Sequence, residues 1–239
     1  MLFLNNFCAV AGLAAGILLS GHSAWAQSSC SSDGQRPPVA LIERFISADC
    51  DTCWTNAATA KPKPGELAVD WIVPSTRGDA APLSAAASRD ALNRLLAISQ
   101  PLPATGFNLR RQVVAKRLAL RVARGVALGG YMGASIELTP SRHTPLATYP
   151  MTARLLLVEA IPAGTDGTPV VRNLVRNSLE IVWNNPGAKP PQGNARQRLY
   201  ESRPISIPEG ANPERLRVVG WVEDAKGKVV ASAASVCLN

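Results

Sequence analysis

Cys50 and Cys53 are two cysteines separated by only two residues. This spacing is typical of redox-active dithiols, because two thiols on one helical turn can close into a small, reducible disulfide. If the first cysteine lies at the start of a helix, the free backbone N–H groups and the helix dipole there favour its thiolate. The pattern therefore predicts thiol–disulfide exchange, with Cys50 as the attacking thiol and Cys53 as the resolving thiol.

The charged residues near this pair set its expected chemistry. Asp49 and Asp51 flank Cys50, and two carboxylates beside a sulfur disfavour the thiolate. The balance with the helix end predicts an ordinary to reducing couple and not a strong oxidant. Glu43 lies seven residues before the first cysteine. It could relay a proton to Cys53, or it could be an exposed strand residue paired with a nearby lysine or arginine.

The elements around the pair follow a strand–helix–strand–helix pattern. An apolar run with β-branched residues precedes the cysteines, and an alanine-rich stretch that extends no further than Lys61 follows them. A second apolar run and a segment with apolar residues at helical spacing come next, the latter with Ser84 or Ser88 as a possible cap. The predicted strands are Val39–Ile46 and Glu66–Val73, and the predicted second helix is Leu83–Ser99. This order predicts half of a thioredoxin-like fold.

The residues Glu43-x-Phe45-x-Ser47-x-x-Cys50-x-x-Cys53 resemble a motif of the DUF1223 family of secreted thioredoxin-like proteins. Weaker similarities to that family occur at Val69–Trp71, Gly167–Arg176 and Val219–Asp224. The resemblance implies a thioredoxin-like fold and a redox-active cysteine pair.

In thioredoxin-like proteins a proline faces the cysteine pair and aligns the incoming mixed disulfide. The resemblance makes Pro103 the best candidate for this proline, with Pro101 next. Two departures from the family pattern are present. Trp54 stands where the family usually has proline, and no clear Thr-Pro loop opens a later strand. A purely structural disulfide, in a domain that kept the fold and lost the chemistry, is therefore the alternative.

The chain changes character after about Phe107. Apolar residues alternate with arginines and alanine between Leu118 and Val122, as in a half-buried strand. Further β-rich runs are Gly133–Leu138, Thr152–Ile161, Val170–Trp183, Leu216–Glu223 and Lys228–Val236. Turn residues separate these runs, and Asp224–Gly227 is typical of a hairpin. Several such strands predict an antiparallel β-sandwich.

These observations predict an α/β thioredoxin-like N-terminal domain followed by an antiparallel β-sandwich domain, α+β overall. The expected boundaries are a signal peptide at 1–26, a flexible arm at 27–37, the thioredoxin-like domain at 38–110 and the sandwich at 111–239. The segment 38–110 is short for a complete thioredoxin-like domain. Either residues 100–114 supply a compressed third strand, or later strands complete the sheet.

The first 26 residues predict export. They contain no Lys, Arg, Asp or Glu, an apolar run from Ala9 to Leu19, and the cleavage signal Ala24-Trp-Ala26. Cleavage near Ala26 would deliver a periplasmic or secreted protein, where disulfides persist. Cys30 and Cys237 lie outside the redox motif, near the two ends of the processed chain, and we expect a disulfide between them. The alternative is that Cys30 is a free thiol on a disordered arm, available to a partner protein. For the Cys50–Cys53 pair a zinc site is the rival, but it would need Cys30 and Cys237 to converge on that pair.

The overall charge of +8 is spread along the sequence, so it indicates solubility and, as a weaker possibility, contact with an anionic envelope surface. Phosphate-loop and nucleic-acid-binding motifs are not evident in the sequence, and we expect no cofactor, metal or nucleic acid. The expected partners are thiol- or disulfide-containing exported proteins or a redox partner. The alternative function is a non-catalytic envelope binding or structural module on a degenerate thioredoxin scaffold.

Overall fold

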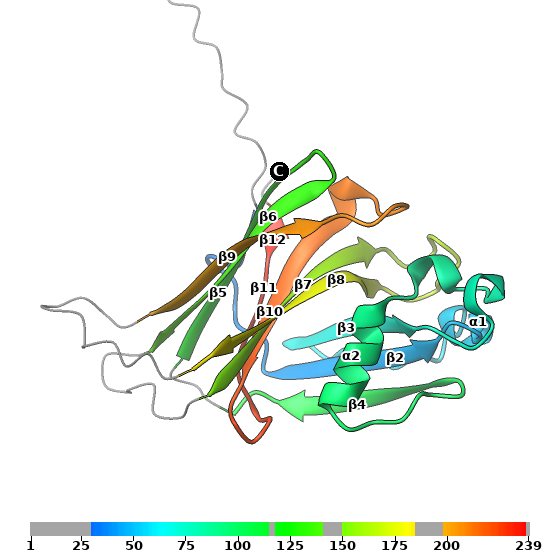
Figure 1. Ribbon diagram of the computed structural model, residues 1–239, viewed down its shortest axis with the longest axis horizontal. Coiled ribbons are helices and arrows are strands. Elements are labelled where there is room, and N and C mark those ends of the chain that lie inside the picture. Colours follow the sequence, from blue (N-terminus) through cyan, green and yellow to red (C-terminus); the bar gives the residue numbers. More distant parts are fainter. Residues whose placement is uncertain (1–29, 115–117, 141–149, 185–197, 238–239) are drawn as a thin grey trace, which may run out of the picture.

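The computed structural model describes residues 30–114, 118–140, 150–184 and 198–237. These residues form two β-sheets with few helices (Figure 1). The strands are β1 (Cys30–Ser31), β2 (Ala40–Ser47), β3 (Glu66–Val73), β4 (Gly106–Gln112), β5 (Leu118–Leu128), β6 (Tyr131–Pro140), β7 (Met151–Ile161), β8 (Arg172–Trp183), β9 (Leu199–Ser206), β10 (Leu216–Glu223), β11 (Val229–Ala234) and β12 (Val236–Cys237). The α-helices are α1 (Asp51–Trp54) and α2 (Arg89–Ala97), and short 3-10 turns lie at Gly78–Ala80, Ser84–Ala86 and Pro213–Arg215.

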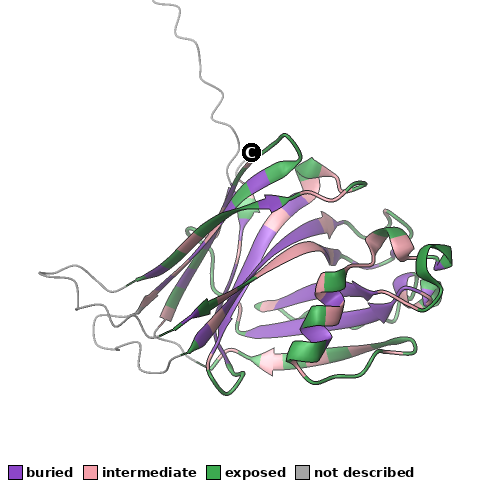
Figure 2. Ribbon diagram, viewed as in Figure 1, coloured by how far each residue is buried: buried purple, intermediate pink, exposed green. Residues whose placement is uncertain are grey.

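The two sheets pack against each other through a shared apolar core. The smaller sheet has the order β12-β1-β5-β6-β9, and the larger one has the order β11-β10-β7-β8-β3-β2-β4. The core between them contains side chains such as Val122, Ile136, Leu155 and Val218, from β5, β6, β7 and β10. β5 and β6 alternate buried and outward residues, because successive side chains of a strand point to opposite faces. β7 and β10 are buried almost throughout, because a second apolar cluster covers their other face. Figure 2 shows the resulting buried band.

The prediction of a thioredoxin-like α/β domain over residues 38–110 is wrong. β2, β3 and β4 do not form a sheet of their own, but continue the large sheet beyond β8 (Figure 1). β3 pairs in parallel with β8 at Asp70 and Leu174, and β4 occupies the edge beside β2. The expected boundary between residues 110 and 111 lies inside β4. The described structure is a mostly β, sandwich-like fold, because the short N-terminal segment completes its sheet with later strands.

The predicted limits of individual strands agree with the structure more closely than the predicted division into domains. β3 and β10 have the predicted limits, and β2 is shifted by one residue. α2 is shorter than the predicted helix, and its N-cap is Ser88, whose side chain accepts a hydrogen bond from the Ala91 N–H. The compressed strand expected within residues 100–114 is β4. β9 was not predicted.

The second half of the chain provides the hairpin expected from its sequence. β10 and β11 are antiparallel neighbours, and the Asp224 N–H donates to the Lys228 carbonyl across the connecting turn. Gly227 adopts a φ of 72° there, in the left-handed region that glycine enters without steric cost. The final hairpin is therefore confirmed.

The described part of the N-terminal arm, Cys30–Pro37, is attached to the small sheet. β1 lies between β12 and β5, and Cys30 forms a disulfide with Cys237, as predicted. Asp33 adds an ion pair with Arg121 of β5, at 2.7 Å. The expected flexibility of this arm is thus not seen in its described part. The predicted signal peptide lies outside the described residues.

Among the helices formed by the described residues, none has the length and apolar character required to span a membrane.

Candidate functional site

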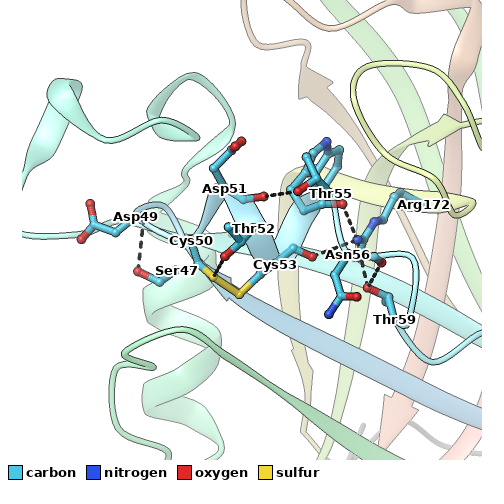
Figure 3. The surroundings of a disulfide bond; sticks show 11 residues. Ser47, Asp49, Cys50, Asp51, Thr52, Cys53, Thr55, Asn56, Thr59 and Arg172 are labelled. Atoms are coloured by element: carbon cyan, nitrogen blue, oxygen red, sulfur yellow. Dashed lines mark hydrogen bonds between the residues drawn. A yellow bond between two sulfur atoms is a disulfide. The ribbon is translucent and has the colours of Figure 1, made fainter.

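The Cys50–Cys53 disulfide lies just beyond the carboxyl end of β2 (Figure 3). The chain leaves β2 at Ser47, and the Ala48 N–H donates to the carbonyl of Val73 at the same end of β3. The Cys50 N–H then donates a hydrogen bond to the Ser47 carbonyl, at 2.9 Å. Two parallel strands that end together thus fix the position of the cysteine turn.

The helix after Cys50 is much shorter than predicted. α1 covers four residues and its last turn closes when the Thr55 N–H donates to the Asp51 carbonyl. A single turn aligns few peptide dipoles, so the expected thiolate stabilisation by a helix N-terminus loses its basis. The carboxylates of Asp49 and Asp51 point away from the sulfur atoms (Figure 3), and Asp49 accepts a hydrogen bond from Ser75 at 3.0 Å. A polar side chain that does contact the disulfide is Thr52, whose hydroxyl lies 3.5 Å from Cys50 Sγ.

The two cysteines differ in their access to solvent. Cys50 is 8% exposed and packs in an apolar cluster with Ile46 and Trp54, whereas Cys53 is partly exposed. Cys53 lines a surface pocket of about 300 Å³. The other lining residues are Arg44, Phe45, Ile46, Asn56, Ala58, Thr59, Ala60, Thr105, Gly106, Phe107, Asn108 and Arg172. A small molecule or an extended peptide segment can therefore approach the disulfide from the Cys53 side.

Arg172, at the start of β8, forms hydrogen bonds with the backbone of the cysteine turn. One of its terminal nitrogens donates to the carbonyls of Cys53 at 3.2 Å and Trp54 at 2.9 Å, and to the Thr59 hydroxyl at 3.3 Å. Its guanidinium also stacks over the Trp54 ring, 4.9 Å from the centroid. Carbonyls at the end of a helical turn lack partners within the helix, so this contact satisfies them. The turn is thereby fixed to the large sheet.

A buried ionic cluster supports Arg172. Asp70 of β3 accepts from Arg172 at 2.9 Å and from Arg44 of β2 at 2.7 Å, and the three side chains are 2% exposed or less. The cluster holds two guanidinium groups and one carboxylate. Burial lowers the pKa of Arg172, the Asp70 carboxylate opposes that shift, and the second guanidinium adds to it. Positive charge is therefore in excess beside the pocket.

Glu43 faces the opposite side of β2 and belongs to a different cluster. Its carboxylate accepts hydrogen bonds from Arg94 of α2 at 2.7 Å and from Arg111 of β4. Both arginines also bind Glu223 of β10. Burial favours a higher pKa for Glu223, but its arginine neighbours outweigh burial and lower the pKa to about 2. The structure therefore assigns Glu43 to an ion-pair network under α2 and gives no support to a proton relay to Cys53.

Pro103 lies in the connection before β4, partly exposed, and is not among the residues that line the pocket. Thr105, two residues later, does line it, and its carbonyl accepts from the Ser47 N–H at 2.7 Å. The residues of this connection and of the start of β4 that line the pocket with Cys53 are thus Thr105 and Gly106. Trp54 is buried beside Cys50, and its indole N–H donates to the Asp166 carbonyl at 2.8 Å. The ring therefore packs in the same apolar cluster as Cys50.

Sequence reasoning missed the roles of Arg44 and Arg172. The available signal was the presence of a charged residue inside each of three apolar runs, at Arg44, Asp70 and Arg172. Buried charged side chains must be paired, but the sequence does not indicate that Asp70 pairs with an arginine about a hundred residues away.

The structure does not support the zinc alternative. The four cysteines Cys30, Cys237, Cys50 and Cys53 are joined as two separate disulfides and do not converge.

No family model matches this chain, and no curated protein matches it. Among solved structures, the chain is similar to HBP35 of Porphyromonas gingivalis, with a TM-score of 0.47 and 10% sequence identity. The similarity covers 84% of this chain and 76% of that one. At this level it establishes neither a shared fold nor a shared activity.

Proposed function

We propose that the Cys50–Cys53 pair exchanges its disulfide with thiols of partner molecules. The observation that carries this proposal is the position of Cys53 at the wall of a surface pocket, in a disulfide that spans only three residues of sequence. A disulfide kept only for stability gains from burial and from a long loop between its cysteines. This one has a short loop and an open side.

The reaction proceeds by two thiol–disulfide exchanges. A thiolate RS⁻ attacks Sγ of Cys53, the S–S bond breaks, and Cys50 leaves as a thiolate that takes a proton from solvent. A second thiolate attacks the outer sulfur of the mixed disulfide and releases RSSR together with the Cys53 thiolate. Two thiols are oxidised to one disulfide, and the protein disulfide is reduced to two thiols. The reverse sequence oxidises the protein.

The direction of attack differs from the one expected from sequence. Cys50 was the expected nucleophile, on the basis of a helix start that the structure reduces to a single turn. Access favours attack at Cys53, because Cys50 is almost fully buried. The Thr52 hydroxyl, 3.5 Å from Cys50 Sγ, is placed to donate a hydrogen bond to the departing Cys50 thiolate.

The proposed setting is the periplasm or the medium outside the cell, with disulfide-containing exported proteins or a redox protein as partners. Two sequence features support it: the uncharged, apolar N-terminal 26 residues and their Ala24-Trp-Ala26 cleavage signal. The Cys30–Cys237 disulfide supports an oxidising compartment as well. A non-catalytic envelope module is the competing reading.

The test is trapping of a mixed disulfide on single-cysteine variants. Cys50→Ser leaves the pocket-lining thiol, and Cys53→Ser leaves the buried one. Each variant is incubated with 2-hydroxyethyl disulfide, and the mass gain is followed over time. We expect Cys50→Ser to form the adduct at least about tenfold faster, because its thiol is accessible. If neither variant forms an adduct in the native state, the exchange function is wrong.

A further inference from the structure

We infer that the pocket beside Cys53 binds a carboxylate group, so that the thiols exchanged at this site are those with a negative charge close to sulfur. This inference rests on the proposed exchange function and names its substrate class. It follows from the charge, the unused donor and the size of the pocket.

The first argument is charge. Arg44 and Arg172 both line the pocket, and Asp70 is the one carboxylate paired with them among the described residues. The cluster therefore carries one uncompensated positive charge. Because all three side chains are buried, water screens this charge less than it screens a surface arginine. A carboxylate in the pocket would compensate it.

The second argument is an unused hydrogen-bond donor. Nε of Arg44 is buried and has no hydrogen-bond partner among the described residues. Its neighbour Nη1 makes only a 3.3 Å contact with the Ala60 carbonyl. A buried donor without a partner is costly, because it has lost its hydrogen bond to water and has formed no other in its place. The guanidinium of Arg44 is thus incompletely satisfied by the protein, and a negative charge in the pocket beside it would compensate part of that cost.

The third argument is the lining and the size. Asn56 and Asn108 offer side-chain amide donors around the pocket, while Ile46 supplies an apolar wall. A volume of about 300 Å³ is at the small end for ligand pockets. It suits a small carboxylated thiol, or one acidic residue next to a cysteine in a peptide.

The test compares three thiols of different charge on the oxidised full-length protein: 3-mercaptopropionate, 2-mercaptoethanol and 2-aminoethanethiol. Each rate constant is divided by that of the same thiol with 2-hydroxyethyl disulfide, which removes differences in intrinsic reactivity. We expect the normalised rate of the anionic thiol to exceed that of the cationic thiol by about tenfold or more, and the difference to shrink in high salt. Cysteine peptides flanked by glutamate or by lysine distinguish a peptide source from a small thiol.

Arg44→Met is the variant that tests the site, because it leaves Asp70 and Arg172 as a balanced pair. Arg203→Met is the matched control: it removes one positive charge from an exposed position on β9. We expect Arg44→Met to abolish most of the charge preference and Arg203→Met to keep it. Circular dichroism verifies folding, and the salt dependence of the unmodified protein tests the same claim without any substitution.

Two outcomes separate the inference from the proposed function. If all three thiols exchange with equal normalised rates in low salt, carboxylate recognition is wrong and exchange stands. If no thiol exchanges, the proposed function is wrong, and binding of succinate to the oxidised protein, measured by isothermal titration, decides on the site alone. Saturable succinate binding that Arg44→Met removes supports the pocket, and absence of binding overturns it.

Discussion

The two disulfides of this protein differ in almost every physical respect. Cys30–Cys237 joins residues 207 apart in sequence and links the neighbouring strands β1 and β12 of the small sheet. Cys30 has no exposed surface. Cys50–Cys53 joins residues three apart, lies outside the strands, and has its second cysteine at a pocket. The first restricts the unfolded chain over a long loop, and the second restricts it much less.

Each disulfide also has its own arginine, with different consequences. Arg124 donates to Cys237 Sγ at 3.3 Å, and burial, with Arg217 nearby, lowers its pKa. Arg172 donates to the backbone carbonyls of Cys53 and Trp54 and not to the sulfur atoms. The disulfide for which we propose exchange is thus held through its backbone carbonyls and not through its sulfur atoms.

The largest expected effect concerns the long-loop disulfide. Replacing Cys30 and Cys237 together by serine should lower the free energy of unfolding by about 5 kcal/mol, the chain-entropy value for a loop of this length. The same replacement of Cys50 and Cys53 should cost about 2 kcal/mol, because its loop is very short. Urea denaturation of both double variants measures the difference. The reverse order of cost would contradict the division of roles.

The next effect concerns the buried Arg44–Asp70–Arg172 cluster, which contacts the turn of the Cys50–Cys53 disulfide. Asp70→Asn leaves two buried guanidiniums without a carboxylate and should cost about 3–5 kcal/mol. Asp33→Asn is the matched control beside the other disulfide, where the exposed ion pair with Arg121 should be worth less than about 1 kcal/mol. Thermal denaturation is the measurement. Equal shifts in Tm would mean that the buried cluster does not support the site.

The network on the opposite face of β2 should govern stability in acid. The pKa of Glu223 is about 2 when folded, below its ordinary value of 4.5, so its stabilisation is complete above pH 4.5 and is lost as the pH falls towards 2. Glu223→Gln should remove about 3 kcal/mol at pH 7 and progressively less in acid. Urea denaturation from pH 7 to 3 tests this, with Glu201→Gln as the control. Because the network lies away from the cysteines, disulfide exchange by folded Glu223→Gln should keep the rate of the unmodified protein.

The smallest effect is expected for the acidic neighbours of Cys50. Their carboxylates point away from the sulfurs (Figure 3), so Asp49→Asn with Asp51→Asn should change the exchange rate with 2-mercaptoethanol by less than about threefold. Stopped-flow measurement of the exchange gives the rate. A change of tenfold or more would restore the electrostatic tuning that the sequence suggested.

The sequence contained most of the strands and both disulfides but not their arrangement. β3, β7 and β10 are apolar runs with clear ends, and their existence follows from local pattern. That β3 lies beside β8 depends on the pairing of Asp70 with Leu174, a non-local contact that no local pattern contains. A strand–helix–strand order therefore looked like a separate α/β domain.

The site shows the same limit. Cys50 and Cys53 were identified from their spacing alone. Their supporting residues Arg44 and Arg172 are 128 positions apart in the sequence and are joined through their shared partner Asp70. The helix that begins after Cys50 ends after one turn, and Arg172 satisfies the carbonyls left at its end. Tertiary contacts thus determine the surroundings of the pair, and local sequence patterns do not contain them.

The most direct test of the exchange function is a redox titration of the folded protein. The protein is equilibrated in dithiothreitol buffers of increasing reducing strength without denaturant, its free thiols are alkylated, and each cysteine is quantified by mass spectrometry. We predict that Cys50 and Cys53 become reduced together, reversibly, while Cys30 and Cys237 stay oxidised. Reduction of Cys50–Cys53 only after the protein unfolds, in step with Cys30–Cys237, would contradict it.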